Sequence, residues 1–111
     1  MPGSADIPTG NVQNIFLLQT TLTPAEVVSA TCVEQTFTVN GLLVGDVVRV
    51  QKPTSQSGVG IAGSRVTAAN TLGVTFINPT VGNVTPTAGE VYLIEVVRRE
   101  NQGYALPTAI V

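Results

Sequence analysis

Short runs of β-branched and other apolar residues, broken by turn signals about every ten residues, limit the possible folds of this chain most strongly. Valine, isoleucine and threonine fit a pleated strand better than a helix. No stretch keeps the ~3.6-residue apolar period of an amphipathic helix. About seven short strands at this spacing predict an all-β fold, a small antiparallel β-sandwich that is jelly-roll-like or a β-barrel. The clearest runs are "NIFLLQTTL" (14–22), "DVVRVQK" (46–52), "TLGVTFIN" (71–78) and "EVYLIEVVRR" (90–99).

The length and the turn residues together predict one domain with two arms. A chain of 111 residues suits a single domain. The first residues hold two prolines and two glycines and few large apolar groups, whereas the last residues are apolar without a strand pattern. We therefore predict an N-terminal arm at 1–14, a β-sandwich domain at 15–99 and a C-terminal tail at 100–111.

Charged residues are scarce, so much of the surface must be covered by uncharged residues. They make up 11% of the chain, against ~25% in ordinary soluble domains. The mean hydropathy is +0.34. One interpretation is a subunit whose surface is largely covered by partners, and the other is a threonine-rich β domain that is soluble without many charges.

The charge and the apolar runs also argue against two classes of partner. The net charge is −2, whereas a nucleic-acid-binding domain usually carries a basic stripe. No apolar run approaches the ~20 residues of a membrane-spanning helix. The start, "MPGSADIPTG", lacks the pattern of a signal peptide. We expect no nucleic acid, no membrane and synthesis in a cytoplasm, which a single cysteine also fits.

The side chains that usually carry catalysis are missing or isolated. The sequence has no histidine, and its single cysteine, Cys32, has no obvious base to activate it. The seven acidic residues are dispersed along the chain, and no aspartate-rich loop indicates calcium. We therefore expect no catalytic residues, no cofactor and no metal.

Several strands are apolar on both faces, which a monomeric sandwich does not need. In 90–99, valines and leucine alternate with tyrosine, isoleucine and valine, and in 14–22 both faces are apolar again. One small sandwich covers only one face of each sheet, so the other face meets another subunit or the arms. The residues predicted at such a contact are Ile15, Leu17, Ile61, Ile77, Tyr92, Ile94, Val96, Tyr104 and Leu106.

The stretch "RVTAANTLGVTFINPT" (65–80) predicts a hairpin. A three-residue loop at 68–70 places Val66 opposite Leu72 on the apolar face, and it places Ile61 opposite Ile77 on the outer side, where a partner subunit would dock. Asn70 takes the loop position that needs a left-handed backbone, which asparagine tolerates. The residues predicted to set turns are Asn40, Gly41, Gly45, Asp46 and Asn70.

The order of turn and core residues from Gly41 to Arg98 resembles small structural proteins of tailed bacteriophages, of the head-decoration (cement), head-fibre and tail-fibre type. The resemblance covers roughly half of the chain and implies a virion protein, typically trimeric, with a β-sandwich or jelly-roll-like module. The chain lacks a long fibrous stalk, which favours a compact decoration protein. The residues that carry the resemblance are Gly41, Gly45, Asp46, Pro53, Arg65, Val66, Asn70, Thr71, Phe76, Asn78, Thr80, Thr85, Pro86 and Gly89.

Two functional hypotheses follow, and neither is an enzyme. The first is a homotrimeric capsid decoration protein, made in the bacterial host cytoplasm, that binds the major capsid protein or other virion proteins and stabilises the head. The alternative is a tail-fibre or adaptor module that binds a host receptor or a glycan. The scarcity of aromatic residues for sugar stacking favours the first.

Overall fold

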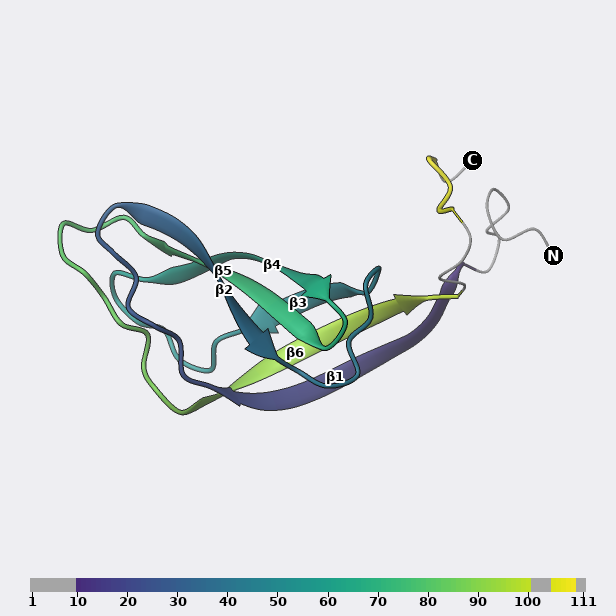
Figure 1. The fold of residues 1–111 in the computed structure, drawn as a ribbon, viewed down its shortest axis with the longest axis horizontal. Helices are drawn as coiled ribbons and strands as arrows, with labels where there is room; N and C mark the ends of the chain where they lie inside the picture. The colour runs from purple at the N-terminus through teal and green to yellow at the C-terminus, as the bar shows by residue number, and fades with distance from the viewer. Residues whose placement is uncertain (1–9, 101–104, 110–111) are drawn as a thin grey trace.

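Six β-strands form the regular structure of residues 10–100 and 105–109, the part of the chain that the computed structural model describes. They build two three-stranded antiparallel sheets, ordered β1-β6-β3 and β2-β5-β4, which pack face to face (Figure 1). The all-β sandwich predicted from the sequence is confirmed, with six strands in place of about seven. The strands are β1 (Val12–Leu22), β2 (Thr31–Thr38), β3 (Val47–Gln51), β4 (Gly60–Ala68), β5 (Thr71–Asn78) and β6 (Glu90–Arg99).

The strand boundaries differ from the prediction at two places. β1 begins at Val12, so the strand takes in the last residues of the predicted N-terminal arm. The segment after β1 forms no strand in the described residues and makes only an isolated bridge between Val27 and Val84. Prolines 24, 79 and 86 lie near the two sides of this bridge. Since proline cannot donate to a ladder, they help to stop the pairing from extending.

The inner faces of the two sheets form the core. On β5, Leu72, Val74 and Phe76 are fully buried, and on β6 Ile94 and Val96 lie against them. Fully burying such a side chain stabilises the fold by about 1.5–3 kcal/mol each. The remaining buried apolar residues are Leu22, Val27, Val39, Leu42, Val48 and Tyr92.

This core corrects the prediction for the last strand. Tyr92, Ile94 and Val96 were expected to meet a partner, but they are at most 1% exposed and lie inside the sandwich. Alternation along β6 then turns the opposite set, Val91 and Leu93, toward solvent. The prediction chose the wrong face of this strand because both of its faces are apolar.

The β4–β5 hairpin keeps the predicted register in its middle and departs from it at both ends. Val66 pairs with Leu72, as predicted, but the strands close at Ala68 and Thr71, with a bulge between Val66 and Ala68. A second bulge, between Ile61 and Gly63, places Ile61 opposite Phe76 and Gly60 opposite Ile77. The predicted Ile61–Ile77 pair is therefore wrong, and Ile61 packs against the core. Each bulge adds one residue to β4 and so reverses which face the following residues occupy.

The turn residues behave as predicted. Gly41, Gly45 and Asn70 have positive φ angles of 97°, 103° and 61°. Asn70 also ties the hairpin tip to the turn after β2, because its Oδ1 accepts a hydrogen bond from the Gly41 N–H (2.8 Å). The Asp46 carboxylate caps its own turn by accepting a hydrogen bond from the Leu43 N–H (3.0 Å).

An ion pair fixes the same end of the sandwich. The Asp46 carboxylate is 0% exposed and receives two hydrogen bonds from the Arg98 guanidinium, at 3.0 and 2.7 Å. Arg98 also donates to the Gly41 carbonyl (2.8 Å) and lies over the Phe16 ring, 5.2 Å from its centroid. The pKa of Arg98 is raised, first by the hydrogen bond to Asp46. The pair joins β1 and β6 to the 40–46 segment.

We predict that Asn70→Gly and Asn70→Val destabilise the protein unequally. Glycine accepts the left-handed backbone and loses only the hydrogen bond to Gly41, which costs about 1 kcal/mol. Valine loses the same bond and adds about 1–3 kcal/mol of backbone strain. Chemical denaturation of the two variants measures the difference in the free energy of unfolding. Equal midpoints for the two variants would contradict the assignment.

Candidate interaction surface

The outer face of the β1-β6-β3 sheet combines large apolar side chains with high exposure. Its residues form rows across the strands, because β6 pairs with both neighbours in register. The first row joins Ile15, Val97 and Val47, and the next joins Leu17, Glu95 and Arg49. We call its six apolar residues the outer stripe: Ile15, Leu17, Val47, Val91, Leu93 and Val97.

The outer stripe is accessible to solvent in the isolated chain. Ile15, Leu17 and Val47 are 63%, 67% and 63% exposed, and Val91 and Leu93 are 47% and 37% exposed. Single exposed apolar residues are common on soluble proteins, but contiguous groups of this kind mark contact sites. Five of the six residues lie on β1 and β6, and the sixth, Val47, lies on β3.

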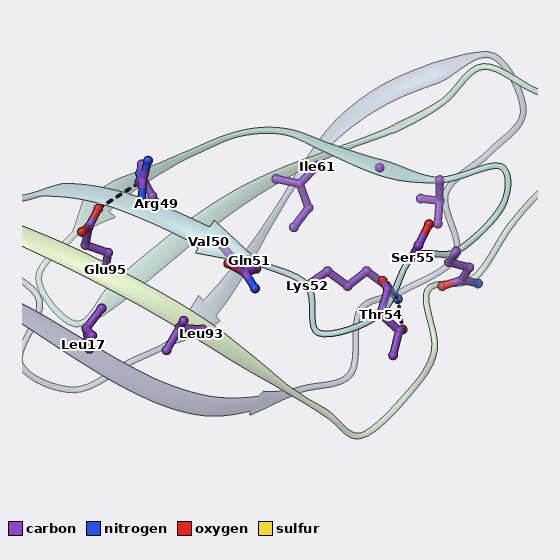
Figure 2. A pocket seen from close by; sticks show the side chains of 13 residues that line it. Leu17, Arg49, Val50, Gln51, Lys52, Thr54, Ser55, Ile61, Leu93 and Glu95 are labelled. Atoms are coloured by element: carbon purple, nitrogen blue, oxygen red, sulfur yellow. Dashed lines mark hydrogen bonds and ion pairs between the residues drawn. The ribbon is translucent and has the colours of Figure 1, made fainter.

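One ion pair lies within this face. Arg49 Nε is 2.8 Å from Glu95 Oε1, with side chains that are 81% and 33% exposed. Figure 2 shows the Glu95 carboxylate directed toward Arg49 and away from Leu17. An ion pair this exposed contributes little to stability. The two charges of this pair cancel, and together with Gln51 the pair makes the β3 side polar.

The outer face of the β2-β5-β4 sheet has the opposite character. Arg65 crosses it to bind Glu34 with two hydrogen bonds of 2.8 and 3.0 Å. The contact passes over Gly73, where a Cβ atom would lie 2.5 Å from Glu34 Oε2. The hydrogen bond from Arg65 holds the pKa of Glu34 below its ordinary value of 4.5. Threonines fill most of the remaining positions, so this face is suited to water.

A shallow groove of about 600 Å³ runs from the outer face around β3 toward Ile61 (Figure 2). None of its lining residues is aromatic, so it offers no stacking surface for a sugar. At its polar end, Lys52 Nζ binds Glu90 Oε1 at 2.8 Å. Thr54 Oγ1 donates a second hydrogen bond to Glu90 (2.6 Å). This end links the exit of β3 to the start of β6.

The titratable groups near the groove are tied to structural partners. Hydrogen bonds from Lys52 and Thr54 hold the pKa of Glu90 below its ordinary value of 4.5. Burial, followed by the nearby Glu90 charge, raises the pKa of Tyr92 above its ordinary value of 10.0. Glu95 is the one carboxylate among the lining residues of this groove, so the lining holds no pair of carboxylates.

Neither a metal-binding cluster nor a membrane-spanning helix is found among the described residues. No group of three or more His, Cys, Asp or Glu side chains within them is arranged to hold a metal ion. Within the same ranges, no helix has the length and apolar character needed to cross a bilayer.

The structure does not bring the residues predicted at a contact together on one surface. Ile15 and Leu17 lie exposed on the outer stripe. Ile77 is 40% exposed, but on the other sheet, and Leu106 is 54% exposed outside the strands. Tyr104 lies outside the described residues. Ile61 lines the groove and packs on the core, as described above.

Four residues of the outer stripe were missed by the prediction: Val47, Val91, Leu93 and Val97. A signal for three of them was present in the sequence. Glu95 shares their face of β6, and a carboxylate in mid-strand marks the side that faces solvent. The position of Val47 needed the pairing of β3 with β6, which brings it beside Val97.

Comparisons of the chain with protein-family models, with curated proteins and with solved structures give no match.

We predict that the stability of the protein falls in acid, in part through Glu90. A carboxylate whose pKa is lowered on folding stabilises the fold above its unfolded pKa of about 4.5, and this contribution is lost as the pH falls through the folded value. Glu90→Gln should lower the melting temperature at neutral pH and make it depend less on pH below 5.

The matched control is Glu26→Gln, which removes an exposed carboxylate that accepts one long hydrogen bond from Asn83 (3.4 Å). Thermal melts of the three proteins between neutral pH and about pH 3 test the assignment. An unchanged pH dependence in Glu90→Gln would contradict it.

Proposed function

We propose that this protein is a non-enzymatic structural subunit that acts by assembling with other protein chains. The observation that carries the proposal is the outer stripe, an exposed apolar surface on an ordered sheet. Such a surface costs solubility unless a partner covers it, and contact sites are its usual explanation. The low content of charged residues, 11%, points the same way.

The sequence resemblance extends this proposal to a particular assembly. A capsid decoration protein of a tailed bacteriophage must bind several neighbouring chains and needs no chemistry of its own. The polar residues of the resemblance are used for structure in this chain: Asn70 sets a turn, Asp46 caps one, and Arg65 binds Glu34. We therefore propose a head decoration protein, with the homotrimer that the resemblance implies.

The described residues favour this role over the alternative of a glycan-binding adaptor. Carbohydrate sites usually rely on aromatic rings and on polar groups placed in a defined pocket. The groove of Figure 2 is open and has no aromatic lining, and its Lys52 and Glu90 bind each other. The largest apolar feature lies on a flat sheet, which suits a protein partner.

Localisation on particles tests the proposed function. We predict that a gold-labelled antibody against this chain decorates the heads of the phage that encodes it, as seen by electron microscopy. Heads from a phage that lacks the gene should release DNA at a lower temperature, and added purified protein should restore their stability. Label at the tail tip would support the adaptor instead, and particles without any label would exclude a virion role.

A further inference from the structure

The free edge of β1 is the second feature that the fold leaves open. β1 is an end strand of its sheet, and among the described residues only β6 pairs with it. The strand is eleven residues long, "VQNIFLLQTTL", and contains no charged residue and no proline. Proteins usually protect an exposed edge with such residues, because the unpaired N–H and C=O groups invite another strand.

The other strands of the sandwich differ from β1 in length or in contacts. At β3, which is the opposite end of the same sheet, the Ser64 hydroxyl of β4 donates to the Val48 carbonyl (3.0 Å). β2 carries Glu34, and its Gln35 side chain exchanges two hydrogen bonds with the backbone of Ala25. Among the four end strands, β1 is the one without a charged residue, and a bulge between Val12 and Asn14 is the irregularity in its pairing.

The outer stripe and this edge are continuous. Ile15 and Leu17 belong to both, because they lie on β1 and point to the outer side of the sheet. The ion pair of Arg49 and Glu95 lies in the same row as Leu17, with Glu95 on the central strand β6 and Arg49 on β3. β1 is the edge strand beside this face (Figure 1), so a partner that covers Ile15 and Leu17 also meets the edge.

The outer face is too small to form a stable contact by itself. Three strands about 4.8 Å apart, followed over seven residues, give a face of about 14 by 20 Å, or about 300 Å² before pleating. Stable interfaces bury about 800 Å² on each partner. The outer face alone is smaller than this, so a lasting contact needs the adjoining edge of β1 as well.

We propose that the outer stripe and the β1 edge form the contact between copies of this chain. A second copy brings the same apolar residues and the same uncharged edge, so it covers apolar surface with apolar surface. Arg49 and Glu95 bind each other, so this pair brings no net charge to the contact between two copies. Interfaces between identical subunits are also the most apolar class. This contact requires no virion role, but it rests on the proposed function in one respect, because it locates the self-contact of the homotrimer named there.

Light scattering of purified variants tests the contact. The wild-type chain should be an oligomer, and Leu17→Lys should be a monomer at the same concentration, because it places a charge in the middle of the stripe. Val81→Lys is the matched control, since Val81 is also apolar and exposed but lies in the loop between β5 and β6, outside the outer stripe. Its oligomeric state should equal that of the wild type.

A cross-linking experiment keeps the test valid if Leu17→Lys fails to fold. In a Cys32→Ser background, Leu17→Cys should form disulfide-linked dimers under mild oxidation, and Val81→Cys should not. A monomeric wild type, or an oligomer that Leu17→Lys leaves intact, would overturn the proposal. So would equal cross-linking at positions 17 and 81. Because these readouts need no phage particle, they can fail while the head label succeeds, and the reverse also holds.

Discussion

The contact between the inner faces of the two sheets is the constraint on which the rest of this structure depends. Each three-stranded sheet can bury only one face against the other, and the buried layer of Leu72, Val74 and Phe76 against Ile94 and Val96 uses that face completely. The strands of the β1-β6-β3 sheet are apolar on both sides, so their second apolar set has no cover within the described chain. The outer stripe is thus a direct consequence of how a small sandwich is built.

The two outer faces show that this exposure is specific to one sheet. The β2-β5-β4 sheet presents threonines and the Arg65–Glu34 pair, with Gly73 leaving room for the contact between them. The β1-β6-β3 sheet, built from the same short chain, presents leucine, isoleucine and valine beside a single neutralised ion pair. A protein that is polar on one face and apolar on the other can bind partners through one face while the other stays in water, as a subunit of a larger assembly requires.

The polar side chains inside the molecule serve the fold. The buried Asn78 donates from Nδ2 to the carbonyls of Val27 and Gly82, at 3.0 and 2.9 Å, and accepts two hydrogen bonds from Thr80. Asp46 and Arg98 close the opposite end in a similar way. A buried polar group without partners costs about 1–3 kcal/mol of stability, so these hydrogen bonds fix the geometry of the loops. The groups are used in the fold and are not free to bind a ligand.

The sequence by itself determined the fold class, the positions of most strands and the turns at Gly41, Gly45 and Asn70, because periodicity and backbone preference are local properties. It could not decide which face of β6 is buried, since Tyr92, Ile94 and Val96 alternate with residues of similar hydropathy. It also missed the two bulges of β4, which moved Ile61 onto the core and away from Ile77. Only the tertiary structure settled these points, because the pairing of strands distant in sequence determines which side chains lie side by side. The outer stripe brings together residues 15 to 97 and exists only in the folded chain.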